Sequence, residues 1–575
     1  MGAIAVIGAG PTGTCLVERI LANAPEFLGH TVLDLHVVDP HPHGPCAVRQ
    51  AERLDLLWAE SAAADITLYT DGSVRCEGPI RSGPSLAEWL GCDPGHFAPR
   101  PALSRYLSDV FERAVRAAPG NVRVHVHREE ATGLAELPGR QRVELAGGRW
   151  LEADAVILVQ GRQGVLPTPE EDAQLAFAAR HNLLYLPTGH PADLSLDELP
   201  AGRPVLVRGA GLAFFDLMVL LTTGRGGRFT RSQDGEPVYR PSGAEPLLHV
   251  GSRRGVPFHA RTGYRLAGPT PGPPRFLTPG ALPAETAELR ELIAKELAYA
   301  YYRELFTAHP SRTRLEPAAF LDAFAAAAWD GRQMRALVTK AVPRFADRLH
   351  LDRLERPLRG MRFGDSAGLQ RWMHGYLAAD LERRADAAYS ADLAMIHGLF
   401  AVHDALPEAA RDPWFQRLSG FLAGGPPGPR LAELRALARA GVVTFLGADL
   451  RIEQEERAGA WRATSPTVPG SVEARALVEA RLPAPSVDRS TDPLIAGLYA
   501  RGEIRDASGL PDVWPADGRL LGQDGVPHPR RFAMGRWAVS GFARPHADAP
   551  LLRHADMLAR TVLAQTAAAG RRAAA

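Results

Sequence analysis

A glycine-rich segment at the start of the chain constrains its fold more than any other feature. The apolar run 3–7 leads directly into Gly-Ala-Gly-Pro-Thr-Gly at positions 8–13, and residues 14–21 then carry apolar side chains at helical spacing. A strand, a Gly-x-Gly-x-x-Gly turn and a helix in this order form the fingerprint of a dinucleotide-binding unit. The first glycine allows a tight turn, the second leaves room for the phosphates, and the third lets the helix approach the strand.

An acidic residue ends the next predicted strand, residues 33–39. Asp39 can accept hydrogen bonds from a ribose, although it lies further from the glycines than the usual ~20 residues. We therefore expect an extended first crossover. The helix N-terminus that follows the turn favours the negative charge of a pyrophosphate. The residues expected to contact this first dinucleotide are Gly8, Gly10, Pro11, Thr12, Gly13 and Asp39.

A second nucleotide motif begins at residue 203. A predicted strand, 203–208, runs into Gly209-Ala210-Gly211, where the third glycine of the fingerprint is missing, and an apolar helix follows at 215–221. The next predicted strand ends in Arg253 and Arg254 instead of an acid. A basic end favours a 2′-phosphate, and hence NADPH over NADH. The alternative is a pair of solvated surface arginines.

The pattern of apolar residues changes after this motif. A Pro/Gly-rich linker at 268–283 leads into a long segment with helical patterning, and strand patterns return only after residue 440. The simplest interpretation is a helical insertion that interrupts the second nucleotide domain. The predicted fold is therefore α/β, with two dinucleotide-binding Rossmann-like domains and a large α-helical insertion.

Composition and charge exclude several classes of protein. A chain of 575 residues is long enough for several domains, and its net charge of +1 gives no general electrostatic case for nucleic acid or an anionic membrane. No apolar run is long enough to span a bilayer. The four cysteines have neither CxxC nor zinc spacing, so we expect reduced thiols in a cytoplasmic protein. We expect no metal site, because His36, His41 and His43 flank a proline-broken loop.

Two further segments are expected to return to the first cofactor. Residues 153–161 form a predicted buried strand that ends at Gln160 and Gly161. Near the C-terminus, Gly541 and Arg544 precede Asp548, which is a good N-cap for the long helix predicted after it. Such a helix N-terminus would stabilise negative charge on the bound cofactor.

With both motifs placed, the chain resembles the bacterial FAD/NAD(P)-binding proteins related to flavin-dependent N-hydroxylating monooxygenases. The resemblance extends to the aspartate N-monooxygenases, which oxidise the amine of aspartate to give nitrosuccinate. It departs at Trp58-Ala59, where relatives tend to show Met-Asn, and at Gln160, where they show Thr. The stretches that carry it are VIGAGPTGTCLVERI, LLWAESAAADITLYTD, GAGLAFFDLMVLLTTGRGGRF, YRPSGAEPLLHVGSRRGVPFHAR, LRALARAGVVTFLG and GFARPHADAPLLRHADMLARTVL.

The resemblance implies FAD and NADPH as cofactors and assigns roles to the domains. Trp58 would lie near the flavin. In chain order we expect the first part of the FAD-binding domain at 1–200, the first part of the NADPH-binding domain at 201–270, a helical insertion that serves as a substrate lid at 271–430, return strands of the NADPH-binding domain at 431–490, and the C-terminal part of the FAD-binding domain at 491–575.

The implied reaction needs dioxygen and a small amino acid, for which the resemblance implies L-aspartate. NADPH reduces FAD, a flavin C4a-(hydro)peroxide forms in a dry pocket, and an uncharged amine attacks it. No dedicated acid–base pair is required, and the candidate substrate contacts are Arg100, His259, Arg261 and His374.

Two rival functions stay open at this point, as does formation of a homo-oligomer. One is an NADPH-dependent flavin dehydrogenase that passes electrons to a quinone or a protein. The other is a non-catalytic flavoprotein that binds a partner. Only the oxygenase couples NADPH consumption to incorporation of oxygen into a substrate.

Overall fold

The computed structural model describes residues 2–41, 54–161, 163–278, 282–406, 413–534 and 550–574. The chain forms two compact units, the first made of 1–173 and 483–575 and the second of 174–482. The sequence predicts these boundaries at 200 and 490. The second unit begins earlier because β8 (Leu184–Leu186) pairs with a strand of its sheet. The first unit resumes earlier because Val165 and Ser490 form a β-bridge.

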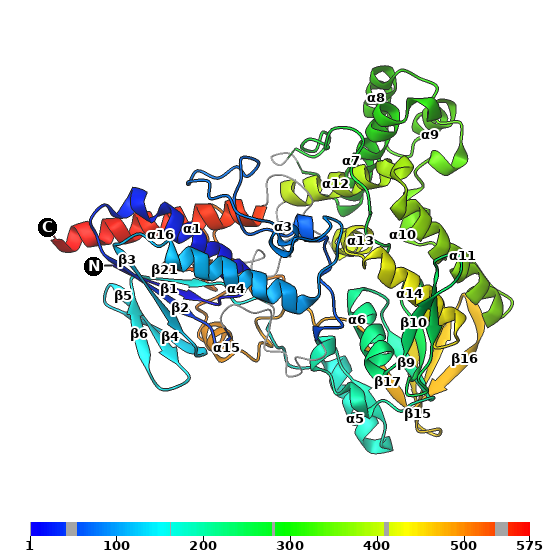
Figure 1. The fold of residues 1–575 in the computed structure, drawn as a ribbon, viewed down its shortest axis with the longest axis horizontal. Coiled ribbons are helices and arrows are strands. Elements are labelled where there is room, and N and C mark those ends of the chain that lie inside the picture. Colours follow the sequence, from blue (N-terminus) through cyan, green and yellow to red (C-terminus); the bar gives the residue numbers. More distant parts are fainter. Residues whose placement is uncertain are drawn as a thin grey trace. The chain divides into compact units, whose positions relative to one another are not determined.

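A six-stranded sheet forms the centre of the first unit, in the order β20-β21-β7-β1-β2-β3 (Figure 1). All neighbours are parallel except β20, which is antiparallel to β21. The strands are β1 (Gly2–Ile7), β2 (Leu33–Val38), β3 (Val122–His127), β7 (Ala155–Leu158), β20 (Arg519–Leu521) and β21 (Pro527–Ala533).

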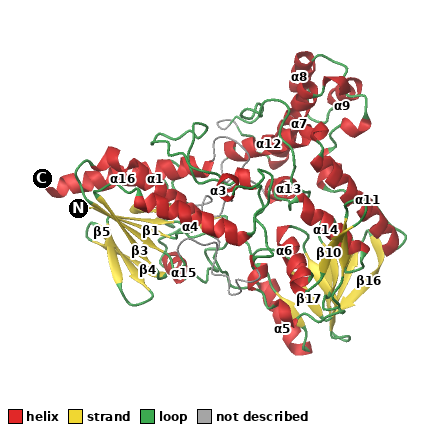
Figure 2. Cartoon of the chain, in the orientation of Figure 1, coloured by secondary structure: helices red, strands yellow, loops and turns green. Residues whose placement is uncertain are grey.

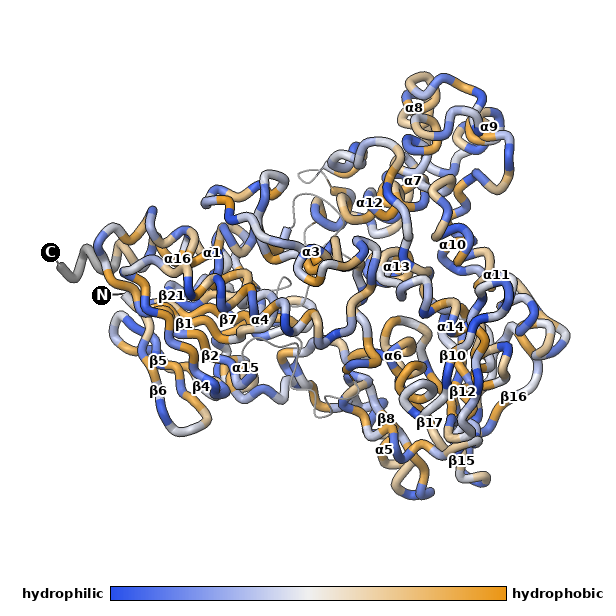
Figure 3. The backbone as a smooth tube through the Cα atoms, in the orientation of Figure 1, coloured by the Kyte–Doolittle hydropathy of each residue, from blue (hydrophilic) through white to orange (hydrophobic). Residues whose placement is uncertain are grey.

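Both faces of this sheet are covered, which explains why β1 is an unbroken apolar run. Ile4 and Val6 pack into one core with α1 (Pro11–Leu28), α4 (Arg100–Arg116) and α16 (Pro550–Ala574). Alternate residues of β1 pack on the other face, and Figure 3 shows the resulting hydrophobic colour along β1 and β7. That face is covered by α15 (Pro493–Ala500) and by the antiparallel strands β4 (Ala131–Leu137), β5 (Arg140–Leu145) and β6 (Trp150–Ala153).

A five-stranded parallel sheet forms the centre of the second unit, in the order β13-β12-β9-β17-β8. Its strands besides β8 are β9 (Pro204–Arg208), β12 (Leu247–Gly251), β13 (Val443–Phe445) and β17 (Ala476–Glu479). The unit also holds α5 (Pro169–His181, which starts in the first unit), α6 (Leu212–Leu221), α14 (Gly428–Arg439), the hairpin β10 (Arg228–Arg231) and β11 (Pro237–Arg240), and the antiparallel strands β14 (Arg451–Glu455), β15 (Ala460–Ser465) and β16 (Val468–Ala474).

A helical segment is inserted between β12 and β13, as the sequence predicts, and Figure 2 shows it as helices and loops. Its core is aromatic: the rings of Phe306 and Phe320 stack with centroids 3.9 Å apart. Within the described residues, no helix is long and apolar enough to cross a membrane. The inserted helices are α7 (Thr286–Ala308), α8 (Pro317–Ala326), α9 (Arg332–Ala341), α10 (Leu351–Glu355), α11 (Ser366–Ala385), α12 (Ser390–Ala405) and α13 (Pro413–Ala423).

The predicted fold class is therefore confirmed: each unit contains a strand–turn–helix on a parallel sheet. In each unit a three-stranded antiparallel sheet comes, in the sequence, just before a strand that pairs with the strand of the glycine turn. In the first unit this strand is β7, which pairs with β1, and in the second it is β17, which pairs with β9. The remaining short elements of the first unit are α3 (Leu86–Leu90), β18 (Asp506–Ala507) and β19 (Leu510–Pro511).

Candidate functional site

The three glycines of the first turn have separate roles. Gly8 has a φ of +110°, and a Cβ there would lie 2.8 Å from the carbonyl oxygen of Val159. A Cβ at Gly13 would overlap the carbonyl oxygen of Gly8. A Cβ at Gly10 would meet no heavy atom of the residues that the structure describes within 4 Å. The protein's own packing thus requires Gly8 and Gly13, whereas Gly10 leaves open space at the N-terminus of α1, as a pyrophosphate requires.

Asp39 lies beside this turn. Its Oδ2 accepts a hydrogen bond from the Ala9 N–H (2.6 Å) and its Oδ1 accepts one from the His41 N–H (2.7 Å). Because each carboxylate oxygen has two lone pairs, both oxygens keep acceptor capacity for ribose hydroxyls. Pro11 and Thr12 form the first turn of α1, whose N-cap is Gly10. The structure therefore brings the predicted contacts of the first motif together at one edge of the sheet.

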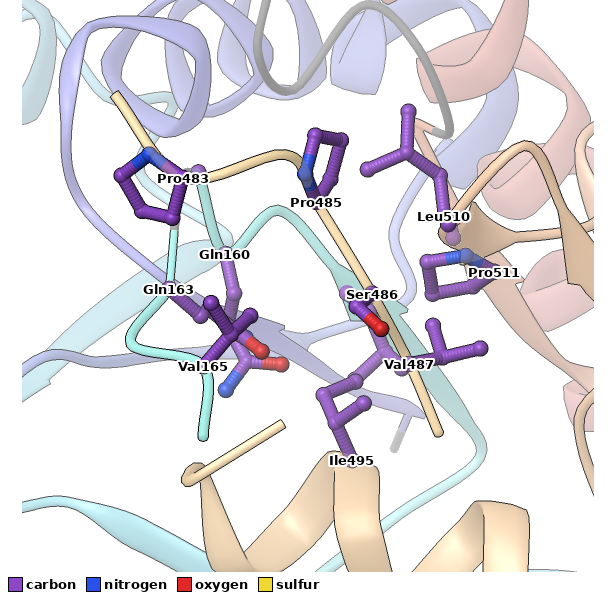
Figure 4. A pocket seen from close by; sticks show the side chains of 14 residues that line it. Gln160, Gln163, Val165, Pro483, Pro485, Ser486, Val487, Ile495, Leu510 and Pro511 are labelled. Carbon is purple, nitrogen blue, oxygen red and sulfur yellow. The ribbon is translucent and has the colours of Figure 1, made fainter. Parts of the chain in front are cut away.

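Gln160 and Gly161 follow β7 and line a pocket of about 50 Å³ in the first unit (Figure 4). The Gln160 Nε2 donates to Asp492 Oδ2 (2.7 Å), and Asp492 also caps α15 by accepting from the Ile495 N–H (3.0 Å). Burial raises the pKa of Asp492. The Gln160 Oε1 is buried and has no hydrogen-bond partner among the residues that the structure describes. A long amide side chain here links the end of β7 to α15, which a threonine is too short to do.

Prolines form much of the wall of this pocket, and the sequence did not predict them as site residues. Pro483 and Pro485 come from the segment that returns to the first unit, and Pro511 ends β19 (Figure 4). The Pro-Ala-Pro spacing at 483–485 was the available signal, since it predicts an extended connection.

Trp58 and Arg100 are brought together in the first unit. Trp58 forms a β-bridge with Pro99, and the Arg100 N–H donates to the carbonyl oxygen of Leu57 (2.9 Å). The Arg100 side chain lies 3.9 Å from Glu60 Oε1. Arg100 is half-buried on the first turn of α4, which packs on α1, and Glu60 is an exposed loop residue.

The second glycine turn is held by close packing in the second unit. Gly209 has a φ of +131°, and a Cβ there would lie 2.6 Å from the carbonyl oxygen of Ala480. A Cβ at Gly211 would lie 3.0 Å from the Phe258 ring, because the Phe258 N–H donates to the carbonyl oxygen of Ala210 (3.1 Å). Gly211 is the N-cap of α6 as Gly10 is of α1, but in the second turn the Phe258 ring lies where the first turn is open among the described residues.

Charged groups meet at the same edge of the second sheet. Glu479, at the end of β17, is fully buried and accepts hydrogen bonds from Arg208 Nε (2.8 Å) and Arg481 Nη2 (2.6 Å). Two guanidinium groups on one carboxylate leave a net positive charge beside Gly209. Such a charge is suited to a pyrophosphate.

Arg253 and Arg254 have different environments. Arg254 is buried, donates to the carbonyl oxygens of Glu355 (2.9 Å) and Arg417 (3.2 Å), and lies 4.4 Å from the centre of the Phe421 ring. Burial, with the nearby Arg253 charge, lowers the pKa of Arg254 to about 10. Arg253 is exposed. Arg254 therefore anchors two inserted segments, and Arg253 is the member of the pair that is available to a ligand.

Comparison with known proteins identifies the family. Residues 5–163 match a family model described as FAD-NAD(P)-binding. The nitrosuccinic acid synthase of Aspergillus oryzae is 34% identical over 97% of this chain and 92% of its own length. The nitrosuccinate-forming L-aspartate N-monooxygenase of Streptomyces davaonensis is 35% identical over 97% of both chains. That of Streptomyces cremeus is 34% identical over 99% of this chain and 96% of its own.

The chain belongs to this family of N-monooxygenases. It is an oxidoreductase with binding sites for FAD and NAD(P). The cofactor prediction is thereby confirmed, and the two glycine turns described above are where an N-monooxygenase of this kind would hold its dinucleotides.

Three of the predicted substrate contacts of this N-monooxygenase lie in the second unit. The His259 Nδ1 is 2.6 Å from Asp380 Oδ1 on α11, and both side chains are buried. The Asp380 Oδ2 also accepts from the Ala260 N–H (2.8 Å), and these contacts lower the pKa of Asp380 against the effect of burial. The His259 Nε2 is buried, and no described residue hydrogen-bonds to it.

The other two contacts in that unit have different surroundings. The Arg261 N–H donates to the carbonyl oxygen of Pro426 (2.9 Å). His374 is also on α11, but burial and the charges of Arg439 and Arg435 on α14 lower its pKa. The structure thus pairs His259 with Asp380 and places His374 beside basic residues of α14. Asp380 was not predicted, because the pairing joins residues 121 positions apart.

Three predicted flavin contacts lie outside the described residues. These are Gly541, Arg544 and Asp548. The helix that they were expected to precede is α16, whose described part begins at Pro550.

Proposed function

We propose that the chain oxidises the amine nitrogen of L-aspartate to give nitrosuccinate, using NADPH, dioxygen and bound FAD. The observation that carries this proposal is the 34–35% identity, over 97% or more of the chain, to relatives that bear this activity in their names. When bound, FAD and NADPH supply the hydride transfer and oxygen activation that no side chain can supply.

The two glycine turns suit the two dinucleotides. FAD fits the first turn, where open space at Gly10 lies beside the N-terminus of α1 and Asp39 retains acceptor capacity. NADPH fits the second turn, where Gly209 and Gly211 open α6 and the nearby strand ends carry basic residues. A cytoplasmic location and homo-oligomer formation stay predictions of the sequence.

The side chains must bind two carboxylates and keep water from the reacting nitrogen. Each carboxylate needs a cationic partner, and Arg261, which lies in the second unit with His259, is the arginine proposed for one of them. His259, oriented by Asp380 through its Nδ1, presents its Nε2 to accept a proton from an ammonium group or to donate one to a carboxylate. With these assignments, the side chains position an uncharged amine in a pocket from which water is excluded.

A substrate panel tests the proposal. The purified enzyme with FAD and NADPH is incubated with aspartate, asparagine, glutamate, lysine or ornithine, while oxygen, peroxide and nitrogen-oxidised products are followed. Aspartate should give product with little peroxide, because asparagine, lysine and ornithine lack the second carboxylate and leaving a buried cation unpaired costs several kcal/mol. Best coupling with lysine or ornithine would contradict an acidic substrate. Turnover of NADPH under anaerobic conditions with a quinone, and with no amine oxidised, would favour the dehydrogenase instead.

A further inference from the structure

Five arginines line one pocket of the second unit. The pocket has a volume of about 160 Å³, and the arginines are Arg253, Arg254, Arg356, Arg359 and Arg362. The only acidic residue among those that line it is Asp449. Such an excess of guanidinium groups around one small volume is suited to a compact anion of more than one charge.

The sheet topology places this pocket at the edge where a nucleotide ribose is expected. Arg253 follows β12 and Asp449 follows β13, and these two strands are parallel neighbours. Their carboxyl ends therefore lie at the same edge of the sheet, and the Asp449 N–H donates to the carbonyl oxygen of Arg253 (3.1 Å). Ligands of parallel α/β sheets bind outside this edge.

The remaining arginines come from the helical insertion. The segment 356–362 follows α10 and turns at Gly360, whose φ is +75°. The Phe363 N–H fixes its far end by donating to the carbonyl oxygen of Thr467 (2.9 Å). At its near end, the carbonyl oxygen of Glu355 accepts from Arg254 Nε (2.9 Å), so the segment lies against the end of the second nucleotide strand, which the sequence does not predict.

Not all of the positive charge is neutralised by the protein. Arg254 donates to two backbone carbonyls, and Arg356 Nη2 lies 3.3 Å from Asp449 Oδ1. Within the part of the chain that the structure describes, Arg359 and Arg362 are exposed and form no ion pair. Partial burial of the guanidinium, together with the neighbouring Arg417 and Arg356 charges, lowers the pKa of Arg253, so the group gains from an anion.

We propose that this pocket receives the 2′-phosphate of NADP(H), with Arg253, Arg359 and Arg362 as its ligands. The inference rests on the proposed use of NADPH and extends it: residues of the inserted segment, and not only the strand end, select NADPH over NADH. A phosphate monoester carries close to two negative charges at pH 7 and accepts several charge-assisted hydrogen bonds. Free phosphate shares this chemistry, so the test separates the two sources.

Calorimetry on the full-length holoenzyme tests the proposal without turnover. Adenosine 2′,5′-bisphosphate, 5′-AMP and inorganic phosphate are titrated into the wild type, Arg359→Ala, Arg362→Ala and Arg335→Ala. Arg335 is an exposed arginine of α9 outside the pocket and serves as the matched control. We expect Arg359→Ala and Arg362→Ala each to weaken binding of the bisphosphate about tenfold or more and to leave 5′-AMP unchanged. The KM for NADPH should rise in the same variants while that for NADH stays constant.

The possible failures are distinct. Equal loss of the bisphosphate and 5′-AMP, or no loss of either, would overturn the proposal. Wild-type binding of inorganic phosphate as tight as that of the bisphosphate would assign the pocket to free phosphate and would also overturn it. If the selective loss is found but aspartate is not oxidised, the proposed substrate fails and the 2′-phosphate site stands.

Discussion

Replacing Gly10 with valine will abolish FAD binding and leave the protein folded. Among the described residues, no heavy atom lies within 4 Å of a Cβ at this position, so the branched side chain enters space that these residues leave open. The same space lies at the N-terminus of α1, where a pyrophosphate must approach the backbone. The variant should purify without the visible flavin absorbance of the wild type while its far-ultraviolet circular dichroism stays unchanged.

Gly13→Ala is the matched control for this prediction. Its methyl group would overlap the carbonyl oxygen of Gly8, so the turn itself must shift and the first unit should lose stability. A Gly10→Val protein that keeps its full flavin absorbance would show that residues 8–13 do not hold FAD. Loss of the folded state in both variants would show that the open space at Gly10 is structural.

Replacing Asp556 with alanine will strongly destabilise the first unit. This buried carboxylate on α16 accepts hydrogen bonds from Asn23 (2.8 Å), from the N–H groups of Glu77 and Gly78 (3.0 Å each) and from Arg19 (3.4 Å). Removing one partner of a buried charged network costs about 3–5 kcal/mol. At roughly 2–4 °C per kcal/mol, the unfolding transition of the first unit should fall by about 10 °C.

Thermal unfolding of the Asp556→Ala variant, followed by circular dichroism and by flavin release, measures this effect. Glu112→Ala, which removes an exposed acid from α4 of the same unit, should leave the transition within about 1 °C. An unchanged transition for Asp556→Ala would mean that the contact between α16 and α1 is dispensable.

Local patterns were enough to predict the elements that carry the two dinucleotides. Glycine spacing, unbroken apolar strands and a shift to helical periodicity predicted β1, α1, β9, α6 and the insertion, because each depends on residues adjacent in sequence. The start of the second unit was predicted too late because β8 is a short strand whose only signal is its pairing with β17.

Contacts between distant residues could not be predicted. The sequence shows that Arg253 and Arg254 are adjacent, but not that Arg254 contacts the Phe421 ring and two carbonyl oxygens of distant residues. The pairing of His259 with Asp380 and that of Gln160 with Asp492 depend on how helices of the insertion and of the first unit fold back. Such contacts follow from tertiary packing and leave no trace in local periodicity.

The most direct test of the proposed function is the fate of labelled oxygen and nitrogen. The holoenzyme is incubated with NADPH, isotopically labelled dioxygen and nitrogen-labelled aspartate, and the masses of the products are measured by mass spectrometry. N-oxygenation predicts nitrosuccinate that carries both labels, with NADPH consumption that depends on aspartate. The proposal would be contradicted if labelled nitrogen were recovered only in unchanged aspartate and NADPH were oxidised at the same rate without aspartate.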